Sequence, residues 1–538
     1  MFLPTTKKEM EVLGWEKADV IIVTGDAYID SSFIGAAIIG KYLLSNGYKT
    51  AIISQPDINS GTDISRLGEP SLFWGVTAGC VDSIVSNYTS TLKKRHKDDF
   101  TPGGINNKRP DYASVVYSNL IRKYFKKTVP IVLGGIEASL RRIAHYDYLK
   151  DAVKRSILFD AKADYLVYGM GEKSSVEIAS KLSQGLSPID IPGLCHISNE
   201  KPKSYTELVS FNDVKDHKEK FTEMFMQFEK NSSLGLCQKQ DTRYLIQNPA
   251  MTYTTKDLDQ IYSLHFERDV HPIQKKQGTV KALETIKYSI TSHRGCFGAC
   301  NFCAISAHQG RDIINRSENS IIEEIKEITK LPNFKGNISD IGGPTANMYG
   351  LTPGNISHAR LINLLKKARS VKGIKKIFIS SGIRYDLIMR DKEFGIEYLK
   401  EIANHHVSGQ LKIAPEHTEE NILKLMGKPG IKYLQAFKKE FEKLSFDAGK
   451  KQFLTYYFIA AHPGCTEKDM LKTKEFALKE LKILPEQVQV FTPTPSTYST
   501  LMYHTEKNPF NKSGIFVEKN IGRKEKQKNI LQKITRKN

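Results

Sequence analysis

Cysteine and tryptophan are scarce in this sequence, with 7 cysteines and 2 tryptophans among 538 residues. No run of 18 apolar residues is present, so no membrane span is expected. The first residues, Met1-Phe2-Leu3-Pro4, are not followed by the apolar stretch of a signal peptide. Four cysteines stand alone and do not form a disulfide framework: Cys80, Cys195, Cys237 and Cys465. These absences predict a cytoplasmic protein in reducing surroundings.

Acidic residues are outnumbered, because 79 lysines and arginines face 59 aspartates and glutamates, which gives a net charge of +20. Such an excess suits a polyanionic partner, nucleic acid above all, and it equally suits a lysine-rich surface without a partner. The dinucleotide fingerprint G-x-G-x-x-G does not follow the first predicted strand. The length exceeds what one hydrophobic core usually holds, so two or more domains are expected.

The remaining three cysteines, Cys296, Cys300 and Cys303, have the spacing C-x3-C-x2-C. Chance would produce it ~0.001 times in a chain with so few cysteines. Three thiolates on one loop can hold an iron–sulfur cubane and leave one iron without a protein ligand. A catalytic metal centre needs such an open position. Gly295 and Gly298 let the loop wrap a bulky cluster without β-carbon clashes.

Two other interpretations of the loop remain open. In the first, the loop is a zinc knuckle with His293 or His308 as the fourth ligand. In the second, it holds an electron-transfer cluster completed by the distant Cys465. The absence of a second close cysteine pair counts against both.

The cysteine spacing, with Phe302 just before the last cysteine, resembles that of the radical S-adenosylmethionine (radical SAM) enzymes. The resemblance implies a 4Fe-4S cluster held by Cys296, Cys300 and Cys303. Its free iron would chelate the amino and carboxylate groups of SAM. Reductive cleavage of SAM would then yield a 5′-deoxyadenosyl radical, and a reductant such as ferredoxin or flavodoxin would supply the electron.

Residues 1–190 are predicted to form a small α/β, doubly wound domain. Apolar strands are expected at 18–25, 50–54, 129–133 and 164–168, with an amphipathic helix over 33–46. The runs Gly134-Gly135-Ile136-Glu137 and Gly169-Met170-Gly171-Glu172 resemble the cobalamin-binding-like domain ahead of many radical SAM cores. The loop after the first strand has no histidine, so histidine-ligated cobalamin is not expected and base-off binding stays open. Residues 191–284 are predicted to be a lysine-rich connector.

Residues 285–505 are predicted to form a partial (βα)6 barrel, the radical SAM core. The six expected strands lie at 288–291, 336–342, 376–380, 410–414, 454–459 and 487–491. By resemblance, Gly342, Gly343 and Thr345 would meet the SAM amino group, with proline in place of the usual glutamate. A plain tight turn is the alternative for this segment.

Arg384 and Glu416, at later strand ends, are candidates for the SAM carboxylate and ribose. A guanidinium matches a carboxylate bidentately, so Arg384 is the better candidate for the carboxylate. A buried ion pair that braces the barrel is the alternative. Cys465 is either a second active-site thiol or a buried cysteine. His405-His406 is expected to be structural.

Most of the chain resembles the YgiQ-type radical SAM family, which is functionally uncharacterised. The resemblance predicts a radical SAM enzyme of unknown substrate, with RNA as a candidate substrate. The alternative is a nucleic-acid-binding protein whose metal loop is structural. The basic tail 506–538 is expected to be solvated and partly disordered, or else to contact nucleic acid. The segments that carry the resemblance are Gly25-Asp26-Ala27-Tyr28, 134–142, 342–349, 381–386 and Ala414-Pro415-Glu416-His417.

Overall fold

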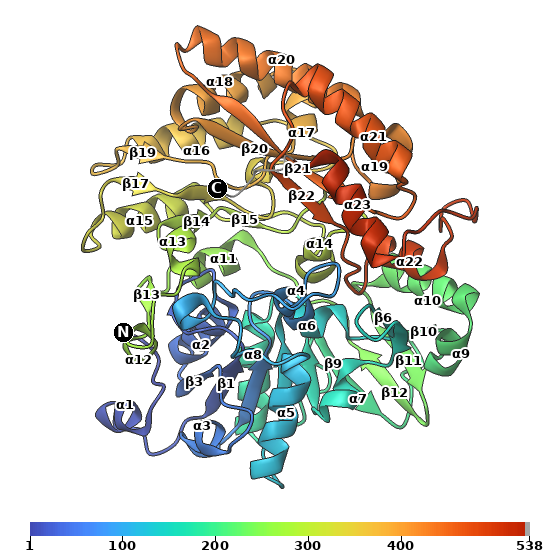
Figure 1. The fold of residues 1–538 in the computed structure, drawn as a ribbon. Coiled ribbons are helices and arrows are strands. Elements are labelled where there is room, and N and C mark those ends of the chain that lie inside the picture. Colours follow the sequence, from blue (N-terminus) through green and yellow to red (C-terminus); the bar gives the residue numbers. More distant parts are fainter. Residues whose placement is uncertain (533–538) are drawn as a thin grey trace. The chain divides into compact units, whose positions relative to one another are not determined.

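The computed structural model describes residues 1–532, and these form two compact units (Figure 1). Unit 1 comprises Met1–Thr252, Leu264–Lys287 and Thr494–Ser496. Unit 2 comprises Tyr253–Ser263, Tyr288–Pro493 and the residues from Thr497 onward. Among residues 1–532, no helix combines the length and the apolar character needed to cross a bilayer.

Unit 1 contains a nine-stranded sheet in the described residues. Five of its strands are parallel in the spatial order β3-β1-β4-β5-β8, which confirms the doubly wound prediction. β1 and β3 are buried at every residue, as expected of parallel strands that are covered on both faces. The five strands are β1 (Val20–Thr24), β3 (Thr50–Ser54), β4 (Phe73–Thr77), β5 (Ile131–Gly134) and β8 (Tyr165–Val167). The longer helices between them are α2 (Gly35–Ser45), α5 (Ala113–Tyr124) and α8 (Glu172–Ser183).

The region predicted to be a connector, 191–284, is different in the structure. Four of its segments extend the sheet of unit 1: β9 (Leu194–Ser198), β10 (Thr206–Leu208), β11 (Leu236–Gln240) and β12 (Arg243–Gln247). The interfaces between β8, β9, β12 and β11 are antiparallel. Several polar side chains of these strands are fully buried, among them Gln238, Gln240 and Gln247, so no apolar pattern marks the strands in the sequence. Helix α11 (Thr255–Tyr262), from the same region, belongs to unit 2.

Unit 2 contains the predicted parallel barrel strands. β14 (Ser289–Thr291) pairs with β18 (Asp340–Gly342), and β17 (Asn337–Ile338) pairs with β19 (Lys376–Ile377). An isolated bridge from Ile383 to Ile413 continues the series toward β20. It ends in the three-stranded sheet of β20 (Gln410–Glu416), β21 (Phe453–Ala460) and β22 (Gln487–Val490). The crossover helices are α15 (Glu318–Thr329), α16 (Ala359–Arg369), α18 (Gly395–His405), α20 (Ile431–Asp447) and α21 (Glu467–Phe476).

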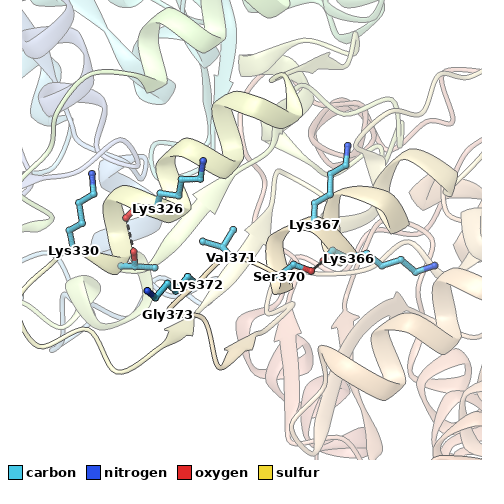
Figure 2. A pocket seen from close by; sticks show the side chains of 9 residues that line it. Lys326, Lys330, Lys366, Lys367, Ser370, Val371, Lys372 and Gly373 are labelled. Atoms are coloured by element: carbon cyan, nitrogen blue, oxygen red, sulfur yellow. Dashed lines mark hydrogen bonds between the residues drawn. The ribbon is translucent and has the colours of Figure 1, made fainter.

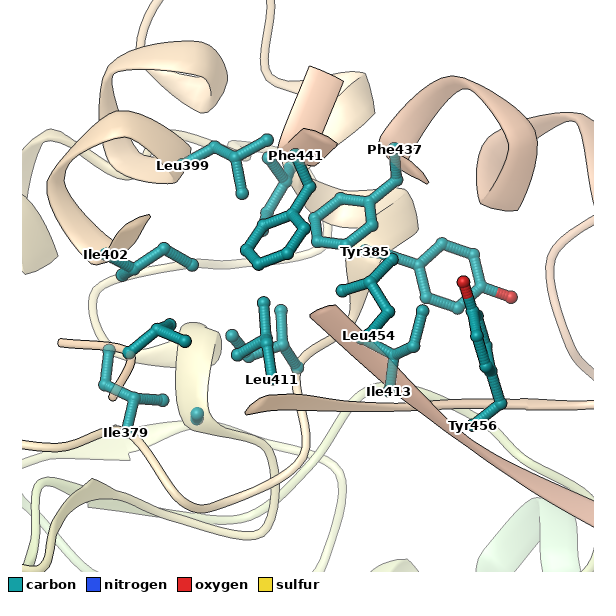
Figure 3. Close-up of a cluster of buried hydrophobic side chains, with 14 of the residues drawn as sticks. Ile379, Tyr385, Leu399, Ile402, Leu411, Ile413, Phe437, Phe441, Leu454 and Tyr456 are labelled. Atoms are coloured by element: carbon teal, nitrogen blue, oxygen red, sulfur yellow. The ribbon is translucent and has the colours of Figure 1, made fainter. Parts of the chain in front are cut away.

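The core of unit 2 lies between these strands and helices, and Figure 3 shows its aromatic part. Phe437 and Phe441 of α20 stack with ring centroids 6.2 Å apart, and both are fully buried. They belong to the same cluster as Leu411 of β20 and Leu399 of α18. One apolar face on each helix therefore holds the strands in their curved arrangement.

The C-terminal region is not the solvated tail that its lysines suggest. α22 (Tyr498–Thr505) and α23 (Ile521–Leu531) are helices, and Gln527 and Leu531 of α23 are fully buried. Lys524 is also buried, and its Nζ donates to the hydroxyl of Tyr503 at 3.0 Å. α23 packs on α21 and on the last two barrel strands, so it covers the edge of the sheet. The final residues of the predicted tail, 533–538, lie outside the described residues.

Candidate functional site

The cysteine loop of unit 2 is closed by a short antiparallel pair, β15 (His293–Arg294) with β16 (Ile314–Asn315). Inside this closure the Cys296 N–H donates to the carbonyl of Gly310 at 3.2 Å. Cys303 stands at the N-cap of the short helix α14 (Ala304–Gln309). β14 leads directly into the loop, so the cysteines emerge at the carboxyl end of a parallel strand, where α/β barrels place their chemistry.

Asn301, between the second and third cysteines, ties the loop to two other parts of unit 2. Its N–H donates to the carbonyl of Met426 at 2.8 Å, and its amide donates to the carbonyl of Leu425 at 2.9 Å. Its own carbonyl accepts the N–H of Ser499 at 2.9 Å. Sequence patterns could not predict this anchor, because its partners are backbone groups from distant segments.

Two arginines fix the base of the loop on Tyr262 of α11. Arg316 is fully buried, and its guanidinium lies 4.4 Å from the Tyr262 ring centroid. It donates to the carbonyl of Thr291 at 2.9 Å and pairs with Glu324. The Nε of Arg294 donates to the Tyr262 hydroxyl at 3.1 Å. The two ends of the cysteine loop are thereby held by groups that are charged and mostly buried.

The three thiols of the loop are half-buried. Burial raises the pKa of Cys303 to about 11, and the charges of Cys300 and Cys296 act in the same direction. Among residues 1–532, no three side chains of His, Cys, Asp and Glu are gathered closely enough to hold a metal ion. Ligand binding by these thiols would release protons, because a metal takes the thiolate.

The segment Gly342-Gly343 packs against the start of the cysteine loop. The Gly342 carbonyl accepts the N–H of Ser292 at 2.7 Å. A Cβ on Gly343 would lie 2.6 Å from Cε1 of His293, so only glycine fits there. Burial lowers the pKa of His293 to about 4, and the imidazole is therefore neutral at pH 7. Thr345 reaches the loop itself, with its Oγ1 3.7 Å from the Cys296 Sγ.

A half-buried acid lies beside Gly342 and was not picked out from the sequence. Asp340 accepts the N–H groups of Ser380 and Ser381 at 2.8 and 3.2 Å, and also the Ser381 hydroxyl. Burial raises the pKa of its carboxyl group. A Cβ on Gly342 would lie 3.1 Å from the Ser381 Oγ, so this polar group directly flanks the glycine segment.

Arg384 has partners that sequence reasoning did not foresee. Its Nε and Nη2 donate to the two carboxylate oxygens of Asp386 at 2.7 and 2.9 Å. Its Nη1 donates to the carbonyl of Gly298 at 2.9 Å and lies 3.9 Å from the Cys300 Sγ. Asn347 pairs with both backbone groups of Arg384, at 2.9 and 3.1 Å. The guanidinium is thus bound to Asp386 and to the cysteine loop.

Glu416 stands at a break in the barrel. The pairing of β20 with β21 shifts register between Ile413 and Glu416, and Glu416 has a φ of 70°. Left-handed backbone on a non-glycine residue costs energy and is common at functional sites. Burial raises the pKa of Glu416, partly offset by Lys428, whose Nζ lies 4.0 Å from the carboxylate.

Three further residues singled out from the sequence, Cys465, His406 and Phe302, have defined contacts within unit 2. Cys465 is fully buried; its Sγ lies 3.5 Å from the His417 Nε2 and 3.5 Å from the Gln527 Oε1. Burial raises its pKa to about 12, so the thiol is neutral. His406 is fully buried and bonded to the carbonyl of Ile377 and to Glu401. Phe302 packs edge-on toward His462, with ring centroids 6.4 Å apart.

A separate hollow of about 910 Å³ lies at the C-terminal ends of α15 and α16 (Figure 2). These helix ends lead into the amino ends of β17 and β19, so the hollow is at the opposite end of the strands from the cysteine loop. Five lysines line it: Lys326, Lys330, Lys366, Lys367 and Lys372. The first four form ion pairs with glutamates, namely Glu323, Glu327, Glu397 and Glu318.

Comparison with known proteins agrees with this geometry. Residues 2–289 match the radical SAM N-terminal family, and residues 290–477 match the radical SAM superfamily. Residues 486–536, which include α23, match a domain of unknown function, DUF3362. The cysteine loop, the parallel barrel and these matches together define a protein of the radical SAM class.

Within this class the chain belongs to the UPF0313 family, whose function is uncharacterised, and the resemblance to the YgiQ-type family is confirmed. A UPF0313 protein of Fusobacterium nucleatum is 54% identical over 98% of this chain and 98% of its own length. A UPF0313 protein of Thermotoga neapolitana is 45% identical over 99% of this chain and 98% of its own.

Two solved structures share the fold at low identity. The radical SAM methyltransferase TsrM from Kitasatospora setae, with cobalamin and a [4Fe-4S] cluster bound, has a TM-score of 0.52 at 15% identity. The match covers 90% of this chain and 77% of TsrM. OxsB, a cobalamin-dependent SAM radical enzyme with aqua-cobalamin bound, has a TM-score of 0.53 at 14% identity, over 90% of this chain and 55% of OxsB.

Proposed function

We propose that this protein is a radical SAM enzyme in which Cys296, Cys300 and Cys303 hold a 4Fe-4S cluster. The observation that carries the proposal is the position of the three thiols. They stand on one loop at the carboxyl end of a parallel barrel, with the Gly342-Gly343 segment packed against that loop. The donor set fits the cluster, because three cysteines leave one iron free for a small ligand.

When bound, the cluster and SAM supply the radical chemistry, and the chain supplies position and shielding. Gly342 and Gly343 give SAM close access to the backbone, and Thr345 lies between this segment and Cys296. Glu416, turned by the register shift and by its left-handed backbone, is the candidate for the ribose hydroxyls. Phe302 contributes an apolar wall beside the last cysteine.

Arg384 is less suited to the SAM carboxylate than its sequence position suggested. Its three donor nitrogens already have partners in Asp386 and Gly298. We assign it a positioning role: it holds the middle of the cysteine loop, near Cys300, against the first turn of α17 (Tyr385–Arg390), which carries Asp386. A cation beside thiolates also stabilises their negative charge.

The partners of the reaction follow from its chemistry. Radical SAM enzymes generally need a reductant, and a ferredoxin or a flavodoxin would serve. RNA is a candidate substrate on the strength of the +20 charge and the hollow lined by lysines. The four glutamates paired with those lysines weaken the local field, so we treat RNA as secondary to the cluster assignment.

The decisive experiment compares cysteine variants after anaerobic reconstitution with iron and sulfide. Wild-type protein should retain iron and sulfide and, with a chemical reductant, convert SAM to 5′-deoxyadenosine. C296A, C300A and C303A should each lose both properties, because two thiolates do not hold a cubane. C237A is the matched control, since Cys237 lies in β11 of unit 1. A colourless wild type with tight zinc, or a C300A variant that keeps its iron, would refute the proposal.

A further inference from the structure

The carboxyl edge of the unit 1 sheet is where a doubly wound domain binds its ligand. In the order β3-β1-β4-β5-β8 the connections reverse direction between β1 and β4, and a crevice is expected there. TsrM and OxsB, which share the fold, were solved with cobalamin bound. Cobalamin carries a corrin ring and a nucleotide tail with a phosphate. Binding of such a group would require free space and unoccupied hydrogen-bond donors at this edge.

The crevice between β1 and β4 is closed by direct backbone packing. A Cβ on Gly25, just after β1, would lie 2.3 Å from the carbonyl oxygen of Ala78, just after β4. A Cβ on Gly79 would lie 2.2 Å from the Asp26 carboxylate. At these two positions the strand ends lie so close together that only glycine fits, and no space for a ligand remains between them.

The space above the two strand ends is filled by a buried ion-pair network. Asp26 has no exposed surface, and it accepts the Cys80 N–H at 2.7 Å. Arg109, 4% exposed, donates to Asp26 at 2.7 Å and to Asp98 at 3.1 Å. Both arginine and Asp98 come from the long segment between β4 and α5. That segment thus folds over the switch point and occupies it with its own charged side chains.

Backbone N–H groups at the start of two helices on this edge are also occupied. Helix N-termini at such an edge are the usual phosphate sites. Here the buried Glu137, which follows β5, accepts the N–H of Ser83 at 2.9 Å and that of Ser114 at 3.0 Å. Ser83 begins α4 (Ser83–Asn87), and Ser114 is in the first turn of α5. One carboxylate of the chain thus takes the place of an anionic ligand at two helices.

No axial ligand for cobalt is offered either. The segment 25–35 after β1 contains no histidine. Cys80 is the nearest soft donor, but burial and the charge of Asp26 raise its pKa well above the ordinary value. A half-buried thiol that is kept neutral is a poor metal ligand.

We propose that unit 1 does not bind cobalamin, because Asp26, Arg109 and Glu137 occupy the ligand site of the doubly wound fold. One consequence rests on the proposed function: the enzyme would run on its cluster and SAM alone, without methyl transfer through cobalt.

The test reconstitutes the full chain with iron, sulfide and hydroxocobalamin, and then removes unbound cobalamin by gel filtration. TsrM, treated in parallel, is the positive control. We expect TsrM to retain cobalamin and this protein to show only background absorbance, with no rise of its thermal midpoint on addition of cobalamin. Stoichiometric retention of cobalamin would overturn the inference.

Iron content and SAM cleavage are measured in the same samples, which separates this inference from the proposed function. Protein that holds iron and cleaves SAM without cobalamin supports both. Protein that holds neither iron nor cobalamin refutes the proposed function and leaves the inference standing. Protein that cleaves SAM only after retaining cobalamin refutes the inference and leaves the cluster assignment standing.

Discussion

The two units end their parallel strands in opposite ways. In unit 1 the strand ends carry Asp26 and Glu137, which are fully satisfied and buried beneath the chain's own loop. In unit 2 the strand ends carry three half-buried thiols, a glycine segment and a glutamate on strained backbone. Both units are parallel α/β structures, so the fold alone does not decide which one performs chemistry. The difference lies in the loops at the strand ends. The residues of these loops, and not the fold itself, determine which unit can carry a functional site.

The largest expected effect is that of acid on unit 2. Burial lowers the pKa of His293 and His417 to about 4 and that of His462 to about 3, against 6.5 in an unfolded chain. Protonation therefore favours the unfolded state, and stability is lost as the pH falls from 6.5 toward 4. Each fully buried histidine contributes a loss of about 3 kcal/mol over that window. In unit 1 burial lowers the pKa of His145 to about 4 and also lowers the pKa of His196 and His271.

Unfolding titrations at pH 7 and pH 4.5 check this difference. Both tryptophans, Trp15 and Trp74, lie in unit 1, so their fluorescence follows unit 1 alone. Far-UV circular dichroism follows both units. We expect the circular dichroism midpoint to fall further than the fluorescence midpoint. An equal fall in the two signals would contradict the comparison.

The second prediction concerns the filled edge of unit 1. R109M removes the shared cation and leaves the carboxylates of Asp26 and Asp98 buried without a cationic partner. Loss of one member of a buried pair costs about 3–5 kcal/mol, so the fluorescence midpoint should shift strongly. R122M is the matched control, because the Arg122–Asp164 pair of unit 1 is partly exposed and worth ~0–1 kcal/mol. Equal losses in the two variants would mean that the network contributes nothing beyond a surface pair.

The third prediction concerns the open edge of unit 2. Burial lowers the pKa of Arg384, but the Asp386 carboxylate raises this pKa above its usual value, so the pair is charged. R384Q should destabilise unit 2 by about 3 kcal/mol and lower the iron retained per chain.

The double variant R384Q/D386N should recover stability, because it removes the unpaired acid. It should not recover iron, because the contact from residue 384 to Gly298 is still missing. R369Q, which breaks the Arg369–Glu401 pair of unit 2, should lose stability and keep its iron. If R384Q and R369Q retain iron equally, the positioning role is wrong.

The smallest expected effect concerns the lysine-lined hollow of unit 2. If RNA docks there, K330Q/K372Q should reduce the slope of log affinity against log salt by about 0.7–0.9 for each lysine that contacts a phosphate. Stability should change by less than about 0.5 kcal/mol, because both lysines are exposed. K220Q, a surface lysine of unit 1, is the control. An unchanged slope would remove the hollow from consideration. Deletion of the C-terminal region would not serve as a test, since α23 is packed into unit 2.

The sequence by itself determined the class of the protein and placed three candidate cluster ligands on one loop. Three cysteines on one short loop remain together in any fold, because local spacing fixes them before tertiary structure forms. The six strands of unit 2 were also predictable, since parallel strands are apolar runs with glycine or proline at their ends. In contrast, the strands β9–β12 and the buried helix α23 were mistaken for a connector and a tail, because polar side chains such as Gln238, Gln240 and Gln527 are fully buried there.

Only the tertiary structure decided how the candidate residues are used. Arg384 stands where a SAM ligand was expected, yet its guanidinium is bound to Asp386 and Gly298, which are respectively local and 86 residues away. Asp26 and Arg109 are 83 residues apart, and their pairing decides whether unit 1 has a ligand site at all. Such contacts depend on which strand ends meet in space. A single sequence records the residues that can pair, whereas the packing of the chain selects the pairs that form.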